Sequence, residues 1–335
     1  MKQVFVFMAV LSMWLSACSQ ERLLSMRIIY EVPIMQARVG SSQMSDSVVY
    51  DYLVDKRFWW QAIDFVNAAA KDKKLFFLND KGDSLNYDTV MCGLATAFGK
   101  VYGLTCTKEE VQRLIEEEVR VIKFEEQWFY NSESMLIEKK VLAFCPVIRK
   151  DTVALQGEEL QTAEAFRFEL GWIKPKGDVI SRDMLVLVRN IEFTMPIYNP
   201  QPYHWWVSHL EAEYSIPFLK RLIARTDSGE VKAYENPSAS EELLRTDILK
   251  RRQFDILERL TASDTEGNVK ERDTVDKALY GSENIDRFRF GEEWCFDKVN
   301  LNFIKKTNYF APMVSIFGKQ GDFRGLYPLY YIRRR

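Results

Sequence analysis

Histidine is scarce in this sequence, and so are the motifs that mark enzyme active sites. Only two histidines, His204 and His209, occur among 335 residues, and their spacing differs from the i,i+4 pair of a zinc-protease helix. No nucleophile elbow, Walker loop or dinucleotide-binding glycine set is present. Carboxylates are plentiful, but no pair stands out for acid–base work, so a hydrolase has the least support. We therefore expect a protein that is not an enzyme, with no catalytic residue, cofactor or metal ligand.

A surplus of charge of either sign is also missing. The chain has 46 Lys and Arg against 48 Asp and Glu, a formal net charge of −2, so nothing favours nucleic acid as the partner. Hydrophobic residues make up 47% of the chain. This excludes a disordered or fibrous protein, because such a composition can bury a large core. The length suggests about two domains.

The first residues have the plan of an export signal. Lys2 precedes a charge-free, mostly apolar segment over 4–15 that is too short to span a bilayer. It leads into Leu15-Ser16-Ala17-Cys18, the pattern at which bacterial lipoproteins are processed. We therefore predict a signal peptide over 1–17 and lipid attachment at Cys18. An ordinary secreted protein without lipid is the alternative.

Lipidation at Cys18 would determine where the protein lies. Ser19 follows the cysteine, in place of the Asp that retains many lipoproteins at the inner membrane. No apolar run approaching 18 residues follows. We therefore expect a soluble body that faces the periplasm and is anchored to the outer membrane. Its lipids would hold it there through a tether over 18–44.

The chain contains an internal repeat. A shift of 166 aligns 124–148 with 290–314 without a gap, and seven of the 25 positions are identical. Fainter likenesses keep the same order: Trp59-Trp60 with Trp205-Trp206, Lys81-Gly82-Asp83 with Ser228-Gly229-Glu230, Tyr87 with Tyr234, and Leu170-Gly171-Trp172-Ile173 with Leu329-Tyr330-Tyr331-Ile332. We predict two tandem copies of one domain over about 45–185 and 200–335.

Alternating aromatic and polar residues predict the centre of each copy. Residues 122–130 and 288–296 alternate with period two, which is typical of β-strands. Turns are expected to begin at Asn131 and Asp297, and Val299 would start a second strand. Each copy therefore centres on an antiparallel hairpin.

Helices are expected beside these hairpins. Thr107 and Glu110 form a capping box ahead of an apolar stripe, and Ser238 opens a similar segment through about Leu260. The predicted fold class is α+β: two tandem repeats of one domain, each an antiparallel sheet with helices packed on one face.

Aromatic side chains on the strands have two interpretations. We expect Trp128 and Trp294 to fill a core, since aromatic burial stabilises a fold strongly. A platform for carbohydrate or peptide is the alternative, to which Trp59-Trp60 and Trp205-Trp206 would contribute. Adjacent residues cannot face one side of a strand, so at least one of each pair would be buried separately. Glu126 and Glu292 are interpreted as charges at a sheet edge or interface.

Cysteines and basic runs leave alternatives open. Cys92, Cys106, Cys145 and Cys295 would lie in a compartment that permits disulfides, and Cys92 with Cys106 is the most local pairing. Because the repeat preserves no bridge, four buried free thiols are the alternative. The runs 250–252 and 333–335 are expected to be solvated, with an acidic partner or lipid headgroup as the other hypothesis.

Landmarks of the second copy resemble a known family. They are Gly229-Glu230-Val231-Lys232-Ala233-Tyr234, Glu292-Glu293-Trp294-Cys295-Phe296-Asp297-Lys298, Ala311-Pro312, and Phe323-Arg324-Gly325-Leu326-Tyr327-Pro328-Leu329-Tyr330-Tyr331-Ile332. In order and spacing they resemble the gliding motility protein family GldN, also called PorN, of the type IX secretion machinery in Bacteroidetes. The first copy shows a fainter likeness.

This resemblance implies a periplasmic scaffold that is not an enzyme. Family members associate with a lipoprotein partner, GldK or PorK, in a large ring beneath the outer membrane. Two copies and a lipobox depart from the familiar pattern, so this chain would be a paralogue with its own lipid anchor. No catalytic or ligand-binding residue is carried over from the family.

The predicted function follows from these points. We expect an outer-membrane lipoprotein that is a scaffold or accessory component of a type IX secretion or gliding motility assembly. Its partners would be envelope proteins, including a GldK/PorK-like lipoprotein, and the membrane through the anchor. The alternative is a surface lipoprotein that binds glycan or peptide through exposed aromatic side chains.

Overall fold

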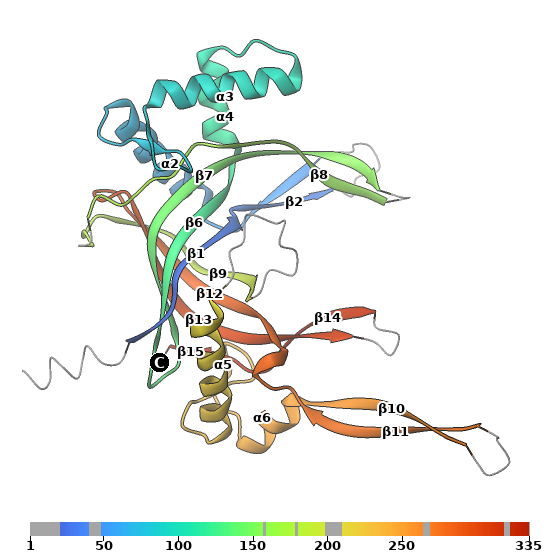
Figure 1. The fold of residues 1–335 in the computed structure, drawn as a ribbon. Coiled ribbons are helices and arrows are strands. Elements are labelled where there is room, and N and C mark those ends of the chain that lie inside the picture. Colours follow the sequence, from blue (N-terminus) through green and yellow to red (C-terminus); the bar gives the residue numbers. More distant parts are fainter. Residues whose placement is uncertain are drawn as a thin grey trace, which may run out of the picture.

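The structure is a computed structural model that describes residues 21–39, 48–156, 159–177, 180–197, 210–263, 269–317 and 322–334. Two larger antiparallel sheets and five α-helices make up most of these ranges (Figure 1). None of the helices in the described ranges is long and apolar enough to cross a membrane.

The first sheet has four strands in the order β1-β6-β7-β8. Their bounds are Glu21–Pro33 for β1, Val119–Asn131 for β6, Ile137–Gln156 for β7 and Glu159–Glu169 for β8. Every neighbouring pair is antiparallel. The alternation that predicted a strand over 122–130 is confirmed by β6.

The second sheet has the order β9-β12-β13-β14, with a short β15 also paired to β13. Its bounds are Met184–Pro196 for β9, Ile285–Asp297 for β12, Asn302–Phe317 for β13, Phe323–Pro328 for β14 and Ile332–Arg333 for β15. All of these pairs are antiparallel. The expected strand over 288–296 is confirmed by β12, whereas the strand expected from Val299 begins at Asn302, after the turn.

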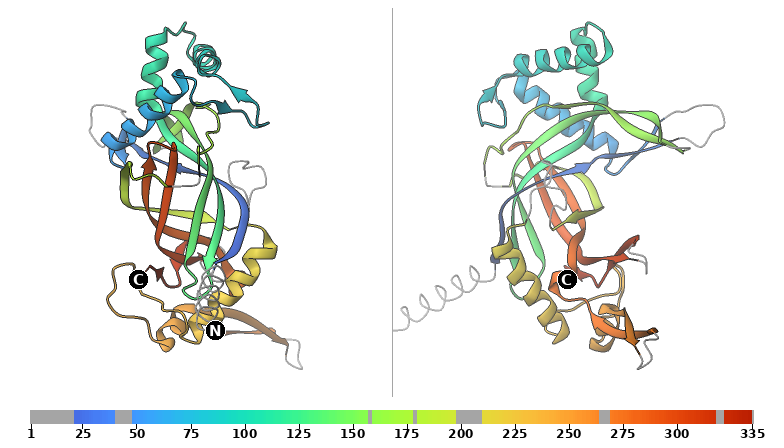
Figure 2. Two further views of the ribbon diagram at one scale, coloured as in Figure 1. Left: turned by 90° about the vertical axis from the view of Figure 1, so that its left-hand side faces the viewer. Right: turned by 45° about the vertical axis from the view of Figure 1, so that its right-hand side comes forward.

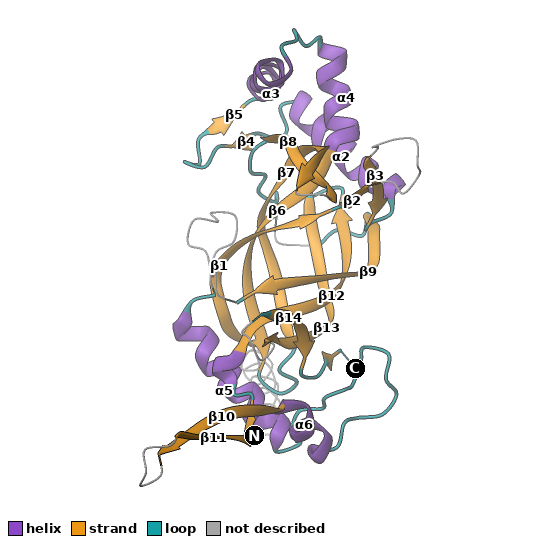
Figure 3. Cartoon of the chain, turned by 90° about the vertical axis from the view of Figure 1, so that its right-hand side faces the viewer, coloured by secondary structure: helices purple, strands orange, loops and turns teal. Residues whose placement is uncertain are grey.

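Helices gather at the two ends of the paired sheets (Figure 3). At one end lie α2 (Lys56–Lys71), α3 (Tyr87–Tyr102) and α4 (Lys108–Glu118); at the other lie α5 (Ala212–Asp227) and α6 (Arg245–Arg252). The capping box of Thr107 and Glu110 opens α4 as predicted. Small elements complete the fold: β2 (Met35–Val39), β3 (Val48–Tyr52), β4 (Phe77–Leu78), β5 (Ser84–Leu85), β10 (Gln253–Ser263), β11 (Val269–Leu279) and a 3₁₀ turn, η1 (Ser282–Asn284).

The two sheets curve toward each other and share one core (Figure 2). A single cluster of buried side chains runs from Leu24 on β1 to Ile332 on β15. Rings from the two sheets meet edge to face: Phe124 with Trp294, and Trp128 with Phe290, both with centroids 5.2 Å apart. Such contacts add to the free energy gained by removing apolar surface from water.

The hairpins β6–β7 and β12–β13 have the same register. Trp128 pairs with Lys139 and Trp294 with Lys305, so both partners differ by 166 between the hairpins. An irregularity in the ladder also recurs, between Glu125 and Glu126 in one hairpin and between Gly291 and Glu292 in the other. The predicted alignment of 124–148 with 290–314 is therefore a structural equivalence as well.

The helices α2 and α5 correspond with a different offset. Both have 16 residues. Each buried position of α2, from Trp59 to Ala70, has a buried counterpart 156 residues later in α5, from Ser215 to Thr226. Backbone bridges join Leu78 to Trp172 and Tyr234 to Tyr331. Because Trp172 and Tyr331 are aligned in the two halves, their bridge partners Leu78 and Tyr234 are equivalent. The predicted alignment of Tyr234 with Tyr87 is therefore wrong. Different insertions follow, α3 with α4 in one half and α6 with β10–β11 in the other.

Each of these helices packs against the sheet of the other half. The N-cap of α2, Asp55, donates its backbone N–H to the Leu187 carbonyl of β9 at 2.8 Å. The N-cap of α5, Glu211, accepts from the Met26 N–H of β1 at 3.1 Å through its side chain. For α2 and α5 this exchange corrects the expectation that helices cover a face of their own sheet, whereas α4, the helix expected after Thr107, contacts β6 and β7 of its own half.

Two further expectations are wrong. The tether over 18–44 contains β1, whose Leu24, Ile28 and Tyr30 are buried in the shared core. Burial of this alternating face makes β1 an integral strand of the first sheet. The helix expected from Ser238 to Leu260 shrinks to α6, because the chain enters the β10–β11 ladder at Gln253.

Candidate interaction surface

Two ion pairs cross the interior between the sheets. Oε1 of Glu126 on β6 lies 2.8 Å from Nζ of Lys305 on β13. Nζ of Lys139 on β7 lies 2.5 Å from Oε1 of Glu292 on β12. All four side chains are 0% exposed. Each half thus contributes one acid and one base, and each acid meets the base of the other half.

Indole rings hold the two carboxylates in place. The Nε1–H of Trp128 donates to Glu126 at 2.7 Å, and that of Trp294 donates to Glu292 at 2.8 Å. Both indoles are fully buried, so the prediction that these tryptophans fill a core is confirmed. Their polar edges also satisfy an acceptor that burial has removed from water.

Phenyl rings cover the two ammonium groups. Nζ of Lys139 lies 3.3 Å from the ring centroid of Phe290, and Nζ of Lys305 lies 3.1 Å from that of Phe124. Each ring again belongs to the other half of the chain. Cation–π attraction is strongest where water is excluded, as it is here.

Tyr30 makes the two ion pairs unequal. Its hydroxyl donates to Glu126 at 2.8 Å and accepts from Lys305 at 2.9 Å. Phe193 occupies the matching place in the second sheet and stacks on Tyr30, with centroids 6.0 Å apart. Burial and the Glu126 carboxylate raise the pKa of the Tyr30 hydroxyl, so it stays protonated.

The buried environment shifts the pKa values of Glu126 and Lys305. Burial would raise the pKa of Glu126, but Lys305 and Lys139 outweigh it, and the pKa is lowered. Burial lowers the pKa of Lys305 to about 8, against the opposing pull of Glu126 and Glu292. No ligand can reach these buried groups, so they determine the fold. The interpretation of Glu126 and Glu292 as sheet-edge or interface charges is wrong for the same reason.

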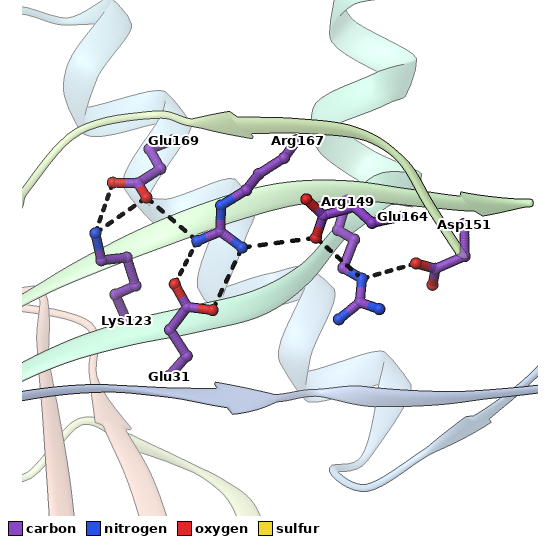
Figure 4. A network of polar contacts seen from close by, with 7 residues as sticks. All are labelled: Glu31, Lys123, Arg149, Asp151, Glu164, Arg167 and Glu169. Carbon is purple, nitrogen blue, oxygen red and sulfur yellow. Dashed lines mark hydrogen bonds and ion pairs between the residues drawn. The ribbon is translucent and has the colours of Figure 1, made fainter. Parts of the chain in front are cut away.

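A second polar network crosses the opposite face of the first sheet (Figure 4). Lys123, next to Phe124 on β6, donates to both oxygens of Glu169 at 3.0 and 2.8 Å. Arg167 joins Glu169, at 3.2 Å, to Glu31 on β1. The network has seven members: Glu31, Lys123, Arg149, Asp151, Glu164, Arg167 and Glu169. Its four acids and three bases attract one another across the strands, so the network ties the sheet together.

A hollow opens between α2 and α4, with a volume of about 620 Å³. Two aromatic rings and three carboxylates line it together with one ammonium group. These residues are Tyr52, Lys56, Trp60, Asp64, Glu116 and Glu117. Trp59 is fully buried and its Nε1–H donates to the Val119 carbonyl at 3.1 Å, whereas Trp60 is half-buried. One member of this tryptophan pair is therefore available at the surface.

Of the residues that line the hollow, Trp60 alone is expected from the sequence to be a binding residue. Trp60 and Asp64 are four residues apart on one helix, which places them on the same face. The run Glu116-Glu117-Glu118 ends α4. A helical pattern over 56–71 was the signal that would have joined these residues.

Several predicted residues lie outside the described ranges. They are Cys18, His204, Trp205, Trp206 and His209. The lipid attachment and the second tryptophan pair therefore stay predictions. Among the described residues, no group of His, Cys, Asp and Glu is arranged to hold a metal ion.

The remaining cysteines are free thiols. Cys145 and Cys295 are buried, Cys92 is exposed and Cys106 is half-buried. The hypothesis of a Cys92–Cys106 disulfide is therefore wrong. The alternative of four buried free thiols is correct in its burial for Cys145 and Cys295 only. Burial raises the pKa of the Cys145 and Cys295 thiols, which makes them unreactive.

The basic runs are only partly solvated. Arg252 is buried and donates to Asp227 at 2.6 Å, whereas Lys250 is exposed. Near the end of the chain, the Arg333 guanidinium stacks on Tyr234 at 3.8 Å from the ring centroid, and Arg334 pairs with Glu138. Arg251, Arg252 and Arg334 are thus each paired with a carboxylate within the chain.

Comparison with known proteins assigns the second sheet to a family. Residues 184–333 match the family model described as gliding motility associated protein GldN. This part of the chain is a GldN-like domain. The match runs from the first residue of β9 to the last residue of β15, so it takes in the second sheet together with α5 and α6. No curated protein and no solved structure matches the chain.

The GldN assignment confirms the resemblance found in the second copy. GldN is a family of gliding motility and type IX secretion components, and it is not a known family of enzymes. The sequence landmarks at Tyr234, Trp294 and Tyr331 all lie within the matched residues, and all three are buried. They serve as determinants of this fold.

Proposed function

We propose that this protein is an outer-membrane lipoprotein that acts as a non-enzymatic scaffold or accessory component of a type IX secretion or gliding motility assembly. The match of 184–333 to the GldN family carries the proposal. Its partners would be envelope proteins, with a GldK/PorK-like lipoprotein as the first candidate. The soluble body would lie in the periplasm.

The proposal also includes a duplication of the GldN-like unit. The first sheet with α2 would be the second such unit, beginning at β1 rather than at residue 45. Equal registers in the two hairpins and equal buried positions in α2 and α5 support it. Paired units would present related surfaces to a repeated partner.

Anchoring at Cys18 would place the folded body close to the membrane. β1 begins at Glu21, three residues after Cys18, and three residues span at most about 10 Å. Labelling with radioactive palmitate tests the anchor. The wild-type protein should take up label and Cys18→Ser should not; an unlabelled wild-type protein would contradict it.

Purification from detergent-solubilised envelopes tests the scaffold role. A tagged full-length protein should recover secretion or motility proteins above the level of an untagged control. Recovery of no envelope protein above that control would contradict the proposal. The Cys18→Ser variant separates the two parts, because partner recovery that survives without lipid would show that the folded body makes the contact.

Glycan or peptide binding remains the second candidate. The half-buried Trp60 in the hollow between α2 and α4 favours it. Carbohydrate and peptide sites commonly combine an exposed ring with polar groups. The negative charge of the hollow favours a basic peptide over a neutral glycan.

A further inference from the structure

The hollow between α2 and α4 has a definite architecture. Lys56, Trp60 and Asp64 follow one another at intervals of four residues, so they form a single face of α2. The other face, including Trp59 and Ile63, is buried in the core. The apolar side of the helix thus fixes the orientation of the side that lines the hollow.

α4 supplies the opposite wall. A hydrogen bond from Lys71 Nζ to Gln112 Oε1, at 3.1 Å, joins α2 to α4. Gln112 also donates to Glu116 at 2.6 Å, which fixes that carboxylate at the hollow. The two helices are therefore held at a set spacing with the aromatic and acidic groups between them.

The hollow carries an excess of negative charge. Asp64, Glu116 and Glu117 face one ammonium group, Lys56, whose Nζ already lies 5.0 Å from the Tyr52 ring centroid. Within the part of the chain that the structure describes, the side-chain carboxylates of Asp64 and Glu117 take part in no ion pair or hydrogen bond. Three carboxylates against Lys56 leave two negative charges in the lining, and Lys71, which also attracts Asp64, reduces this excess to one.

Two physical terms make this arrangement costly in the free protein. Glu116 and Glu117 occupy the last turn of α4, where the helix dipole already carries negative partial charge. Burial and the nearby Glu116 also raise the pKa of Asp64. A bound cation would relieve both terms, whereas a neutral ligand would relieve neither.

We propose that this hollow binds an arginine-bearing basic segment of another protein. A guanidinium group can stack on the Trp60 ring while its N–H groups donate to Asp64 and Glu117. Arginine is favoured over lysine because its planar group makes both contacts at once. This inference rests on the proposed scaffold role only in supplying a protein partner, since the site chemistry is independent of that role.

Binding of labelled peptides to the full-length protein tests the proposal. The probes are fluorescein-labelled hexa-arginine, hexa-lysine and hexa-glutamate, measured by fluorescence anisotropy at low and high salt. Hexa-arginine should bind most tightly, with an affinity that falls as salt rises. Equal binding of hexa-glutamate would overturn the proposal.

Matched variants locate the site. Asp64→Asn combined with Glu117→Gln should weaken hexa-arginine binding by about tenfold or more, because charge-assisted hydrogen bonds are lost. Trp60→Leu should also weaken it. Glu241→Gln, an exposed acid in the second half, should leave binding unchanged, and thermal melts would show that each variant is folded. Unchanged affinity in a folded double variant would overturn the site.

The remaining outcomes also decide the question. Oligosaccharide binding that depends on Trp60 but not on Asp64 and Glu117 would overturn the basic-segment proposal in favour of a glycan site. Failure of all peptides, with envelope proteins still recovered by the tagged chain, would reject this inference and leave the scaffold role standing. If the tagged chain recovered no envelope protein but still bound hexa-arginine, the scaffold role would be rejected and the basic-segment site would stand.

Discussion

Glu126 and Lys305 lie 179 positions apart in the chain and form a buried ion pair at 2.8 Å. Their counterparts 166 positions away, Glu292 and Lys139, form the same contact in the opposite direction. An unpaired charge in a protein interior costs several kcal/mol. Each half of this protein therefore buries charges that only the other half neutralises, so the two halves depend on each other for stability.

Removing one member of a pair should destabilise the protein more than removing both charges. Lys305→Met leaves Glu126 buried without its partner and should lower the free energy of unfolding by about 3–5 kcal/mol. The double variant Glu126→Gln/Lys305→Met keeps an acceptor for Trp128 and should recover a large part of this loss. Urea unfolding of the wild type, both single variants and the double variant measures the coupling.

An exposed ion pair supplies the control for that cycle. Arg27 pairs with Glu125 at 2.8 Å, and the arginine side chain is 62% exposed. Arg27→Ala should cost less than about 1 kcal/mol because water screens the pair. If Lys305→Met cost no more than Arg27→Ala, the charges in the core would contribute nothing to the pairing of the sheets.

The hydroxyl of Tyr30 should contribute separately. Tyr30→Phe removes hydrogen bonds to Glu126 and Lys305 and should lower the free energy of unfolding by about 1–3 kcal/mol. Phe193 already fills the matching place with a phenyl ring, so the change should not disturb packing. Tyr309→Phe removes a hydroxyl bonded to Glu192 in a less buried setting and should cost less. Equal melting of wild type and Tyr30→Phe would show that this hydroxyl has no net effect.

The sequence predicted the strands better than it predicted their partners. Period-two alternation located β6 and β12, because these strands bury one face. The repeat aligned Glu126 with Glu292 and Lys139 with Lys305, but an alignment of like with like does not say which acid meets which base. That pairing arises only when the two sheets face each other.

Other misses have local causes. β1 was assigned to a tether because the repeat became visible only downstream, yet Tyr30 at its centre contacts the ion pairs. The helix expected from Ser238 fails where the charged residues after Arg252 enter a two-stranded ladder. The hollow forms only when α2 packs beside α4, a contact that the sequence does not show. Of its lining residues, Trp60 alone was predicted from the sequence as a binding residue.

Truncation of either buried indole should destabilise the protein strongly. Trp128→Ala and Trp294→Ala should each lower the free energy of unfolding by about 3–5 kcal/mol, since each opens a large cavity in the shared core. Each also removes the N–H donor of a buried glutamate. Trp60→Ala, at a half-buried position, should cost less. An unchanged urea midpoint for either core variant would contradict its role in the core.

Asp297 should make stability depend on acid pH. It accepts from the Ser181 backbone N–H at 2.8 Å, from the Ser181 hydroxyl at 2.6 Å, and from the backbone N–H groups of Val299 and Asn300 at 3.0 and 3.1 Å. Burial would raise its pKa, but the hydrogen bonds from Ser181 and Asn300 lower it from 3.8 to about 2. The ionised form therefore stabilises the fold.

The sign follows from linkage. Because the pKa is lower in the folded state, this contribution is complete above pH 4 and is lost as the pH falls toward 2; it amounts to about 2 kcal/mol. In the other hairpin, Asn131 makes the same kind of turn, with Oδ1 accepting from the N–H groups of Glu133 and Ser134 at 2.9 Å each. Asp297→Asn should therefore keep the turn while losing the pH-dependent term.

Urea unfolding between pH 7 and pH 2 measures this difference. Asp297→Asn should be less stable than wild type by about 2 kcal/mol at pH 7, and the two should converge as the pH approaches 2. Asp183→Asn is the control, because its side chain is 59% exposed and pairs with Lys298 at the surface. A gap between wild type and Asp297→Asn that stayed constant across this range would mean that the carboxylate is not the group that titrates.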